Sequence, residues 1–261
     1  MAVLSLVAAL LWVSSVACAG GVWQGAIWVP EPNLSWQYQL QGEIDSSVPA
    51  DVYVIDLFDV DESVIAGLQA SGRNVVCYLN AGAIEEWRPD AGDYPPELVG
   101  EPLQRWPGES WLDVRRIAQL EPIIAARIDL CRAKGFDAVD PDNLDGYLQE
   151  TGFPITADDQ LRFNRTISRL AHDRGLGVGL KNDVDQIPEL VGSFDFAVNE
   201  RCYAEEECAA LQPFVDAGKA VLHVEYEPPT SEFCPTTTAL GFSSIRKSWD
   251  LGADREACPM N

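Results

Sequence analysis

Three aspartates gather in the stretch from Val139 to Asp145, and they are the residues of this chain best suited to chemistry. Asp140, Asp142 and Asp145 lie at or just beyond the end of an apolar run that reads as a short buried strand. Like charges held this close raise one another's pKa and oppose folding. Barrel enzymes keep their catalytic residues at the ends of strands. The stretch therefore indicates a functional site, with a solvated acidic loop as the simpler alternative.

Polar side chains end several other apolar runs in the same way. They are Asp56; Tyr78 and Asn80; Lys181, Asn182 and Asp183; Asn199 and Glu200; and Glu225 and Tyr226. Each residue alone is compatible with a helix cap or a salt bridge. Their recurrence at successive strand ends predicts one site at one mouth of the fold.

The alternation of side chains along a strand sorts these residues by face. Asp140 and Asp142 share one face of their strand. Val198 and Glu200 share a face of a second strand, and His223 and Glu225 share a face of a third. If those faces line a barrel, at least four acids meet Lys181 at a single mouth.

Paired carboxylates without a partner histidine suit glycoside hydrolysis. One carboxyl group must be protonated to assist the leaving oxygen, and the other stays ionised to attack or stabilise the sugar cation or to activate water. Tryptophans supply surfaces on which sugars stack, and we expect two or three of them to do so. The available ones are Trp23, Trp28, Trp36, Trp87, Trp106, Trp111 and Trp249.

The chain has few of the residues that other kinds of catalytic site or a zinc site require. It has only two histidines, which disfavours a histidine-based zinc site or a catalytic triad. We expect His172 to be superficial and His223 to have a hydrogen-bonded structural role. An EF-hand loop needs glycine at its sixth position, and counting back from Gly146 puts Pro141 first. We therefore expect no cofactor and no metal, with a looser Mg²⁺ or Ca²⁺ site as the alternative.

Eight short runs predict the strands that position these residues, most of them covered on both faces. They are residues 36–40, 52–58, 75–80, 111–114, 136–140, 177–181, 194–199 and 220–225. Helical patterns alternate with them at residues 63–70, 117–134, 158–174, 187–191 and 205–217. This order predicts an α/β fold, a single-domain (β/α)8 TIM barrel over residues 20–261. The long link over residues 83–110 is rich in Pro and Trp, and we expect it to fold over one barrel mouth.

Residues 1–19 are expected to be a secretory signal peptide. They carry no charged side chain, and an apolar run is followed by Ala17-Cys18-Ala19 as small cleavage residues. The run is short for a membrane span, and no other candidate span follows. A lipid anchor on Cys18 is a weaker alternative, because Ser15 stands where such sites prefer Leu. We therefore expect an extracellular protein without a membrane span.

The formal net charge of −23 limits the partners of this chain. Nucleic acid is not expected as a partner, because binding it requires Lys and Arg to displace counterions. A cationic ligand would be attracted, although the solubility of a secreted protein also explains most of the acidity. We expect a monomer.

Six cysteines remain outside the signal peptide, in a compartment that permits disulfides. Six cysteines allow fifteen pairings. Closeness in sequence favours Cys202 with Cys208, and the loop-rich C-terminal part favours Cys234 with Cys258. Cys77 in an apolar strand and Cys131 in a helix are expected to be buried free thiols.

Motifs along the whole chain beyond the signal peptide resemble glycoside hydrolase family 114, the endo-α-1,4-polygalactosaminidases. The matching segments are Trp36-Gln37-Tyr38-Gln39-Leu40-Gln41-Gly42, Asp56-Leu57-Phe58-Asp59, Cys77-Tyr78-Leu79-Asn80-Ala81-Gly82, Trp87-Arg88-Pro89-Asp90, Trp111-Leu112-Asp113-Val114-Arg115, Asp140-Pro141-Asp142-Asn143-Leu144-Asp145-Gly146-Tyr147, Gly179-Leu180-Lys181-Asn182-Asp183, Asn199-Glu200-Arg201-Cys202 and Glu225-Tyr226. The resemblance implies a TIM barrel that cleaves inside polymers of α-1,4-linked galactosamine, some of it N-acetylated.

The resemblance also implies roles for individual residues. The catalytic Asp and Glu of the family fall on Asp142 and Glu200, with Glu200 favoured as proton donor and Asp142 as nucleophile or stabiliser. Asp140 stands where the family is expected to have Glu. The substrate-binding candidates are Asp56, Tyr78, Asp140, Lys181, Asn182 and Glu225.

A cationic polysaccharide would give the acidic mouth a use, because free galactosamine units carry ammonium groups near neutral pH. Lys181 would hold Asp142 or Glu200 ionised. Two alternatives stay open: a hydrolase of a different polysaccharide on the same fold, and a sugar-binding barrel without turnover. The degree of acetylation preferred and the stereochemical outcome also stay open.

Overall fold

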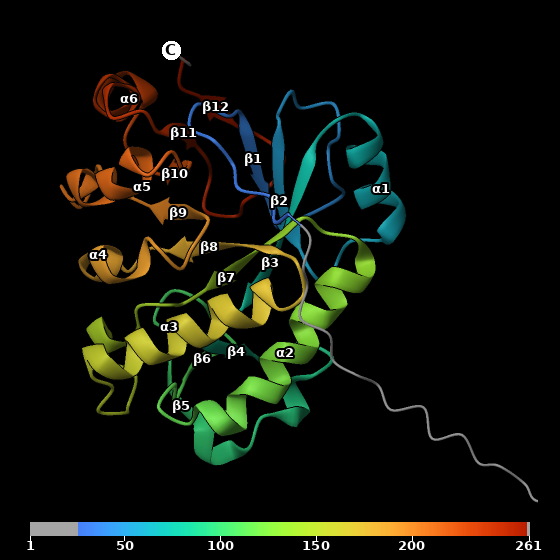
Figure 1. Ribbon diagram of the computed structural model, residues 1–261, viewed down its shortest axis with the longest axis vertical. Coiled ribbons are helices and arrows are strands. Elements are labelled where there is room, and N and C mark those ends of the chain that lie inside the picture. The colour runs from blue at the N-terminus through green and yellow to red at the C-terminus, as the bar shows by residue number, and fades with distance from the viewer. Residues whose placement is uncertain (1–25, 260–261) are drawn as a thin grey trace, which may run out of the picture.

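The computed structural model describes residues 26–259, so the predicted signal peptide lies outside the described residues. Eight parallel strands form a curled sheet (Figure 1). They are β1 (Trp36–Gln39), β2 (Val52–Asp56), β3 (Asn74–Asn80), β7 (Ala138–Asp142), β8 (Gly177–Lys181), β9 (Phe196–Glu200), β10 (Val221–Glu225) and β11 (Ser243–Arg246). The last strand, β12 (Glu256–Ala257), pairs antiparallel with β11. This architecture confirms the predicted TIM-barrel fold.

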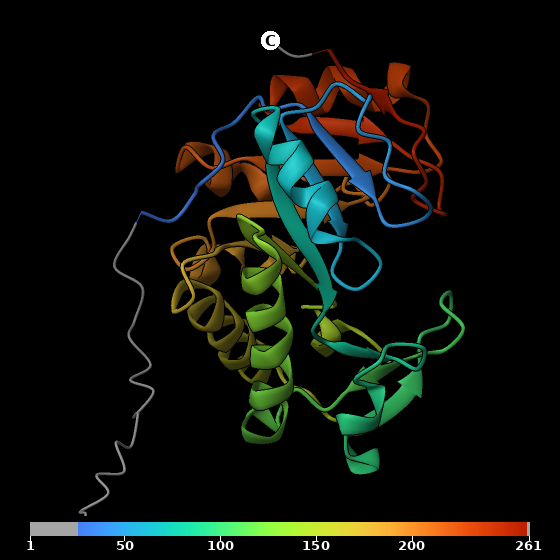
Figure 2. The ribbon, with the colours of Figure 1, turned by 90° about the vertical axis from the view of Figure 1, so that its right-hand side faces the viewer.

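One of the predicted strands was assigned wrongly, and one strand of the barrel was not predicted. Residues 111–114 were expected in the barrel, but β6 (Glu109–Leu112) lies in a separate antiparallel sheet with β4 (Ala83–Glu85) and β5 (Val99–Pro102). The parallel strand that completes the set of eight is β11 instead. The small sheet, with the short 3₁₀ helices η1 (Ala91–Asp93) and η2 (Pro96–Leu98), is inserted between β3 and α2 (Figure 2).

Helices cover the outer face of the sheet, and all but α6, which was not predicted, overlap the predicted helical segments. They are α1 (Glu62–Ala70), α2 (Ile117–Lys134), α3 (Ala157–His172), α4 (Ile187–Leu190), α5 (Gln212–Asp216) and α6 (Thr230–Ala239). Three 3₁₀ helices, η3 (Gly146–Leu148), η4 (Val184–Gln186) and η5 (Cys208–Leu211), complete the connections. None of the described helices is long and apolar enough to cross a membrane.

Alternate side chains of the parallel strands fill the inside of the curled sheet. Trp36, Val54, Val76, Val198 and Leu222 belong to this inner cluster. Their alternate neighbours belong to a second cluster between the sheet and the helices. Alternation along each strand therefore decides whether a polar residue at the strand's end points to the inside or to the helical layer.

Side chains and loops join the first and last parallel strands. The indole N–H of Trp36 in β1 donates to the carbonyl of Ser243 in β11, at 2.8 Å. Farther along, the amide of Leu40 donates to the carbonyl of Leu251, at 2.9 Å. These contacts hold the edges of the sheet together, so the carboxyl ends of the strands surround one mouth.

Three disulfides tie the elements together. Cys202 pairs with Cys208 and Cys234 with Cys258, as predicted. The prediction that Cys77 and Cys131 are free thiols is wrong, because they form the third bond, which joins β3 to α2. The two residues are 54 positions apart, and only the packing of the helix on the sheet brings their Cα atoms within 6.0 Å.

Candidate active site

Three neighbouring strands bring the predicted catalytic residues together at the mouth. Asp142 ends β7, Lys181 ends β8 and Glu200 ends β9. The ammonium group of Lys181 lies 3.0 Å from Asp142 Oδ1 and 3.3 Å from Glu200 Oε1. The side chain of Lys181 is only 2% exposed, whereas those of Asp142 and Glu200 are 21% and 22% exposed. One buried cation thus lies between two carboxylates that reach solvent.

Asp142 is held in its ionised form. The phenol of Tyr78 donates to its Oδ2 at 2.7 Å, and the backbone N–H of Asn143 donates to its Oδ1 at 2.8 Å. Burial acts to raise the pKa of Asp142, but the charge of Lys181 and these hydrogen bonds outweigh burial and lower it. A carboxylate in this state can act as a nucleophile or a base near neutral pH.

Lys181 is equally fixed in its charged form. Burial acts to lower its pKa, but the surrounding negative charge, Asp142 first and Glu200 second, raises it well above the usual value. Its Nζ also donates to the hydroxyl of Tyr38 at 3.1 Å. Lys181 lies below the acids and lines no part of the cleft, so the prediction that it contacts substrate is corrected. Its role as an electrostatic tuner stays a prediction.

Asn182 fixes the end of the strand that carries Glu200. Its side-chain oxygen accepts a hydrogen bond of 2.9 Å from the backbone N–H of Glu200. Asn182 has a positive φ of 50° and borders the cleft. The backbone of β9 is thereby tied to the turn after β8, which keeps Glu200 next to Lys181.

The predicted face of β10 was wrong. His223 and Glu225 point to the helical layer, where the His223 ring packs against Phe233 and its Nε2 lies 3.0 Å from Glu225 Oε1. Glu225 has no exposed surface and accepts from the backbone N–H of Tyr203, at 2.8 Å. Glu225 therefore offers no contact to a substrate, and His223 has the expected structural role.

Tyr226 occupies the mouth position that was assigned to Glu225. It borders the cleft and stacks on Trp249 with ring centroids 4.0 Å apart. Burial, followed by the nearby charge of Glu200, raises its pKa well above the usual value. The phenol therefore keeps its proton and stands beside Glu200 as a hydrogen-bond donor.

Asp140 shares the inward face with Asp142 but lies one layer deeper. It is fully buried and does not line the cleft, so the prediction that it contacts substrate is corrected. Neither of its side-chain oxygens has a hydrogen-bond partner among the described residues. Burial raises the pKa of Asp140 to about 7. It is largely uncharged below that pH, under Lys181 and Tyr38.

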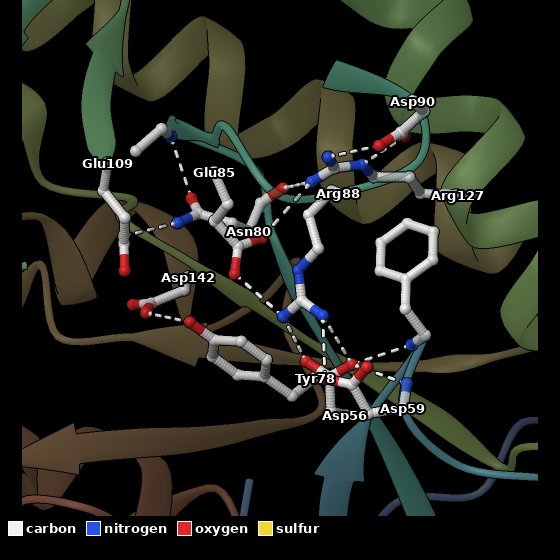
Figure 3. Close-up of polar contacts among 12 residues, drawn as sticks. Asp56, Asp59, Tyr78, Asn80, Glu85, Arg88, Asp90, Glu109, Arg127 and Asp142 are labelled. Atoms are coloured by element: carbon white, nitrogen blue, oxygen red, sulfur yellow. Dashed lines mark hydrogen bonds and ion pairs between the residues drawn. The ribbon is translucent and has the colours of Figure 1, made fainter. Parts of the chain in front are cut away.

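Asp56 borders the cleft, but its charge is already neutralised. Arg88, which comes from the inserted segment, donates to Asp56 through both terminal nitrogens and to Glu85 Oε1 at 2.8 Å (Figure 3). Arg127 of α2 binds Asp90 at 2.7 Å and the backbone carbonyl of Asn80 at 2.8 Å. These guanidinium groups anchor the insertion to the barrel, and a direct contact of Asp56 with substrate stays a prediction.

The insertion contributes a residue that the sequence did not indicate. Glu109 of β6 borders the cleft, and its Oε2 accepts from Asn80 Nδ2 at 3.1 Å. Burial, then the charge of Asp142, raises the pKa of Glu109 to about 8. The Pro- and Trp-rich link was predicted to fold over one barrel mouth, but nothing in its pattern marked this glutamate.

The site opens into a cleft of about 1440 Å³. Trp87 and Trp106 of the insertion line it and are 54% and 41% exposed. Ten acids and two arginines border the cleft: Asp56, Asp59, Glu85, Glu101, Glu109, Asp142, Asp145, Glu150, Glu200 and Asp250, with Arg88 and Arg105. The lining is therefore strongly acidic, with aromatic side chains on its outer part.

Potential metal ligands gather at one place within the described residues. Cys202, Cys208 and His223 are the only described group that brings three such ligands together, and the two sulfurs are joined in a disulfide. The carboxylates at the mouth are engaged with Lys181 instead.

Comparison with known proteins decides the family of this site. The profile of the glycoside-hydrolase family GH114 matches residues 22–261. The chain belongs to this family. It is therefore a glycoside hydrolase.

Solved structures agree with this assignment. Aspergillus fumigatus Ega3, in its complex with galactosamine, is 37% identical, with a TM-score of 0.85 over 91% of this chain and 100% of Ega3. The glycoside hydrolase domain of PelA from Pseudomonas aeruginosa is 12% identical, with a TM-score of 0.68 over 89% of this chain and 100% of that domain. The PelA domain shows the shared fold alone. No curated protein sequence matches the chain.

Proposed function

We propose that this GH114 glycoside hydrolase cleaves inside polymers of α-1,4-linked galactosamine, with Asp142 and Glu200 as the catalytic pair. The observation that carries the proposal is the pair of carboxylates bridged by Lys181 at the floor of an acidic cleft. A relative of 37% identity, Ega3, has been solved with galactosamine.

The two acids divide the reaction between them. Asp142 stays ionised because Lys181, Tyr78 and the Asn143 backbone stabilise its charge. It therefore attacks or stabilises the sugar cation that develops at the anomeric carbon. Glu200, which accepts fewer hydrogen bonds, delivers the proton to the leaving oxygen, with the protonated phenol of Tyr226 beside it.

The shared lysine supports retention of configuration. Asp142 Oδ1 and Glu200 Oε1 cannot lie farther apart than the sum of their distances to Lys181, 3.0 Å and 3.3 Å. That sum is below the roughly 6.5–9.5 Å between carboxyl groups in inverting enzymes, whereas retaining enzymes have about 5–5.5 Å. Proton NMR of the first product formed should show the α-anomer, and an initial β-anomer would refute retention.

The cleft suits a cationic polymer. Its volume of about 1440 Å³ exceeds the roughly 300–1,000 Å³ of a site for one small ligand. Its ten acids attract ammonium groups, and of its two arginines Arg88 is already neutralised by Asp56 and Glu85. Exposed Trp87 and Trp106 offer faces on which sugar rings can stack.

The protein is proposed to act outside the cell after removal of residues 1–19. Three disulfides support this, because such bonds form and persist in oxidising compartments. The remaining chain, residues 20–261, is proposed to act as one catalytic domain and as a monomer.

The test is incubation of the wild-type protein with α-1,4-linked polymers of defined acetylation, followed by mass spectrometry of the products. Internal cleavage should release a ladder of galactosamine-containing oligomers from the partly deacetylated polymer. Binding without products would indicate a sugar-binding barrel. Cleavage of a different polysaccharide, with none of the galactosamine polymer, would overturn the substrate assignment.

A further inference from the structure

Glu109 is a partly buried acid of the cleft wall that has no cationic partner within residues 26–259. Arg88 forms ion pairs with Asp56 and Glu85, Arg127 binds Asp90, and Lys181 lies between Asp142 and Glu200. The contacts around the two arginines are drawn in Figure 3. Among the described residues, no ion pair forms with Glu109. Within the described part of the chain, the one hydrogen bond of its carboxyl group is accepted from the Asn80 amide, at 3.1 Å.

The position of Glu109 is rigid. Asn80, which ends β3, has its side-chain oxygen fixed by the backbone N–H of Ala83 at 2.8 Å and by the Asn143 amide at 3.1 Å. Its amide nitrogen is therefore directed at Glu109. β6, which carries Glu109, pairs with β4 directly opposite Glu85. The carboxyl group is held at the cleft wall from two sides.

The negative charges around Glu109 act more strongly on its carboxyl group than the positive charges do. Asp142 on β7 and Glu85 on β4 oppose its ionisation, whereas Arg88 and Lys181 favour it more weakly. Burial adds to the opposition, and together these effects raise the pKa of Glu109 to about 8. The free enzyme therefore holds a partly buried, mostly neutral carboxyl group next to its ionised catalytic aspartate.

We propose that Glu109 receives the ammonium group of a galactosamine unit bound beside Asp142, and so selects units that carry a free amine. The inference rests on the proposed function and deepens it. The substrate supplies to Glu109 the kind of cation that Glu85 and Asp142 already find in Arg88 and Lys181. An N-acetyl group supplies no charge, so it gains nothing from this contact and leaves Glu109 protonated.

Two consequences follow from the proton balance. An arriving ammonium group stabilises the ionised form of Glu109 and lowers its pKa. Near pH 6.5 the free group is protonated, so binding of the amine releases a proton to the solvent. Binding of an N-acetylated unit releases none from Glu109.

Glu109→Gln tests the proposal, because glutamine keeps an oxygen that can accept from Asn80 but carries no charge. Calorimetric titration with galactosamine oligomers should show affinity reduced by about tenfold to a hundredfold. The affinity for fully N-acetylated oligomers should stay within about twofold. Glu97→Gln, which removes an exposed acid of the same insertion outside the cleft, is the matched control and should leave both affinities nearly unchanged.

Repeating the titration at pH 6.5 in buffers of different ionisation enthalpy measures the proton release. The protein that keeps Glu109 should release a proton with the amine ligand, and Glu109→Gln should not. Equal losses for both ligands, or unchanged amine affinity, would overturn the proposal. Each protein in these titrations also carries Glu200→Gln, which stops cleavage of the ligand, so binding is measured without turnover. Amine binding that depends on Glu109, in a protein whose unmodified form cleaves no galactosamine polymer, would overturn only the proposed function.

Discussion

Lys181→Met removes the one cation between Asp142 and Glu200 while roughly preserving side-chain volume. Burial acts to raise the pKa of Asp142, and in this variant only the hydrogen bonds from Tyr78 and Asn143 remain to lower it. At an effective dielectric constant of about 20, opposite charges 4 Å apart attract by about 4 kcal/mol. One pKa unit corresponds to about 1.36 kcal/mol. With Asp142 partly exposed to solvent, the pKa should rise by about two units.

The sign of the effect on activity follows from the role of Asp142. The ionised group is the active one, so activity is present above its pKa and is lost as the pH falls through it. In the wild type this pKa is lowered, so the acid limit lies below the usual range. In Lys181→Met the acid limb of kcat/KM against pH should move up by about two pH units, with residual activity near pH 7.

Lys247→Met is the matched control. Lys247 is also a buried lysine near the end of a barrel strand, but its ammonium group donates to the carbonyls of Gly252 and Asp254, both at 2.6 Å. Both variants should be destabilised, and only Lys181→Met should shift the pH profile. A carbon-detected NMR titration of the Asp142 carboxyl group gives the same answer without turnover. An unchanged pKa of Asp142 in Lys181→Met would refute the electrostatic role of Lys181.

Three other predictions follow from the described structure. Replacing Cys77 and Cys131 together by Ala should lower the free energy of unfolding by about 4 kcal/mol, because the disulfide closes a loop over a separation of 54 residues. Thermal unfolding measures this loss, and kcat should not change. Burial raises the folded-state pKa of Asp140 to about 7. The wild type therefore loses stability as the pH rises through 7, and Asp140→Asn should remove this loss and stabilise the protein at high pH. Melting at pH 9 should show a gain on the order of 2–4 kcal/mol that shrinks toward pH 4, and a gain independent of pH would contradict it. Rising salt should slow cleavage of deacetylated polymer more than of acetylated polymer, because exposed charges are screened over about 10 Å at 0.1 M; equal slopes in initial rates would mean that the acidic cleft does not steer substrate.

The strand ends and the alternation of side chains were sufficient to predict that Asp142 and Glu200 meet at one mouth. Their roles as a catalytic pair came from the family resemblance and stay a proposal. Ala138 and Asp140 precede Asp142 on the inward face of β7, and Phe196 and Val198 precede Glu200 on that of β9. The structure places both acids beside Lys181. On β10 the same reasoning failed. Both faces of a barrel strand are buried, so the pattern in residues 220–226 does not show whether Glu225 or Tyr226 faces the mouth.

The remaining errors come from contacts that are distant in sequence. β11 has only four residues, two of them serines, and becomes a strand through its pairing with β10. Residues 111–114 are apolar enough for a barrel strand, but β6 pairs within the insertion instead. Glu109 and the bond between Cys77 and Cys131 depend in the same way on how the insertion and α2 dock on β3.

The turnover of Asp142→Asn and Glu200→Gln on partly deacetylated galactosamine polymer tests the central claim most directly. Both changes nearly preserve volume, so melting temperatures within a few degrees of the wild type would assign any loss of activity to the chemistry. The proposal predicts that each variant loses at least about a hundredfold in kcat. Wild-type turnover in either variant would contradict the assignment of that residue to catalysis.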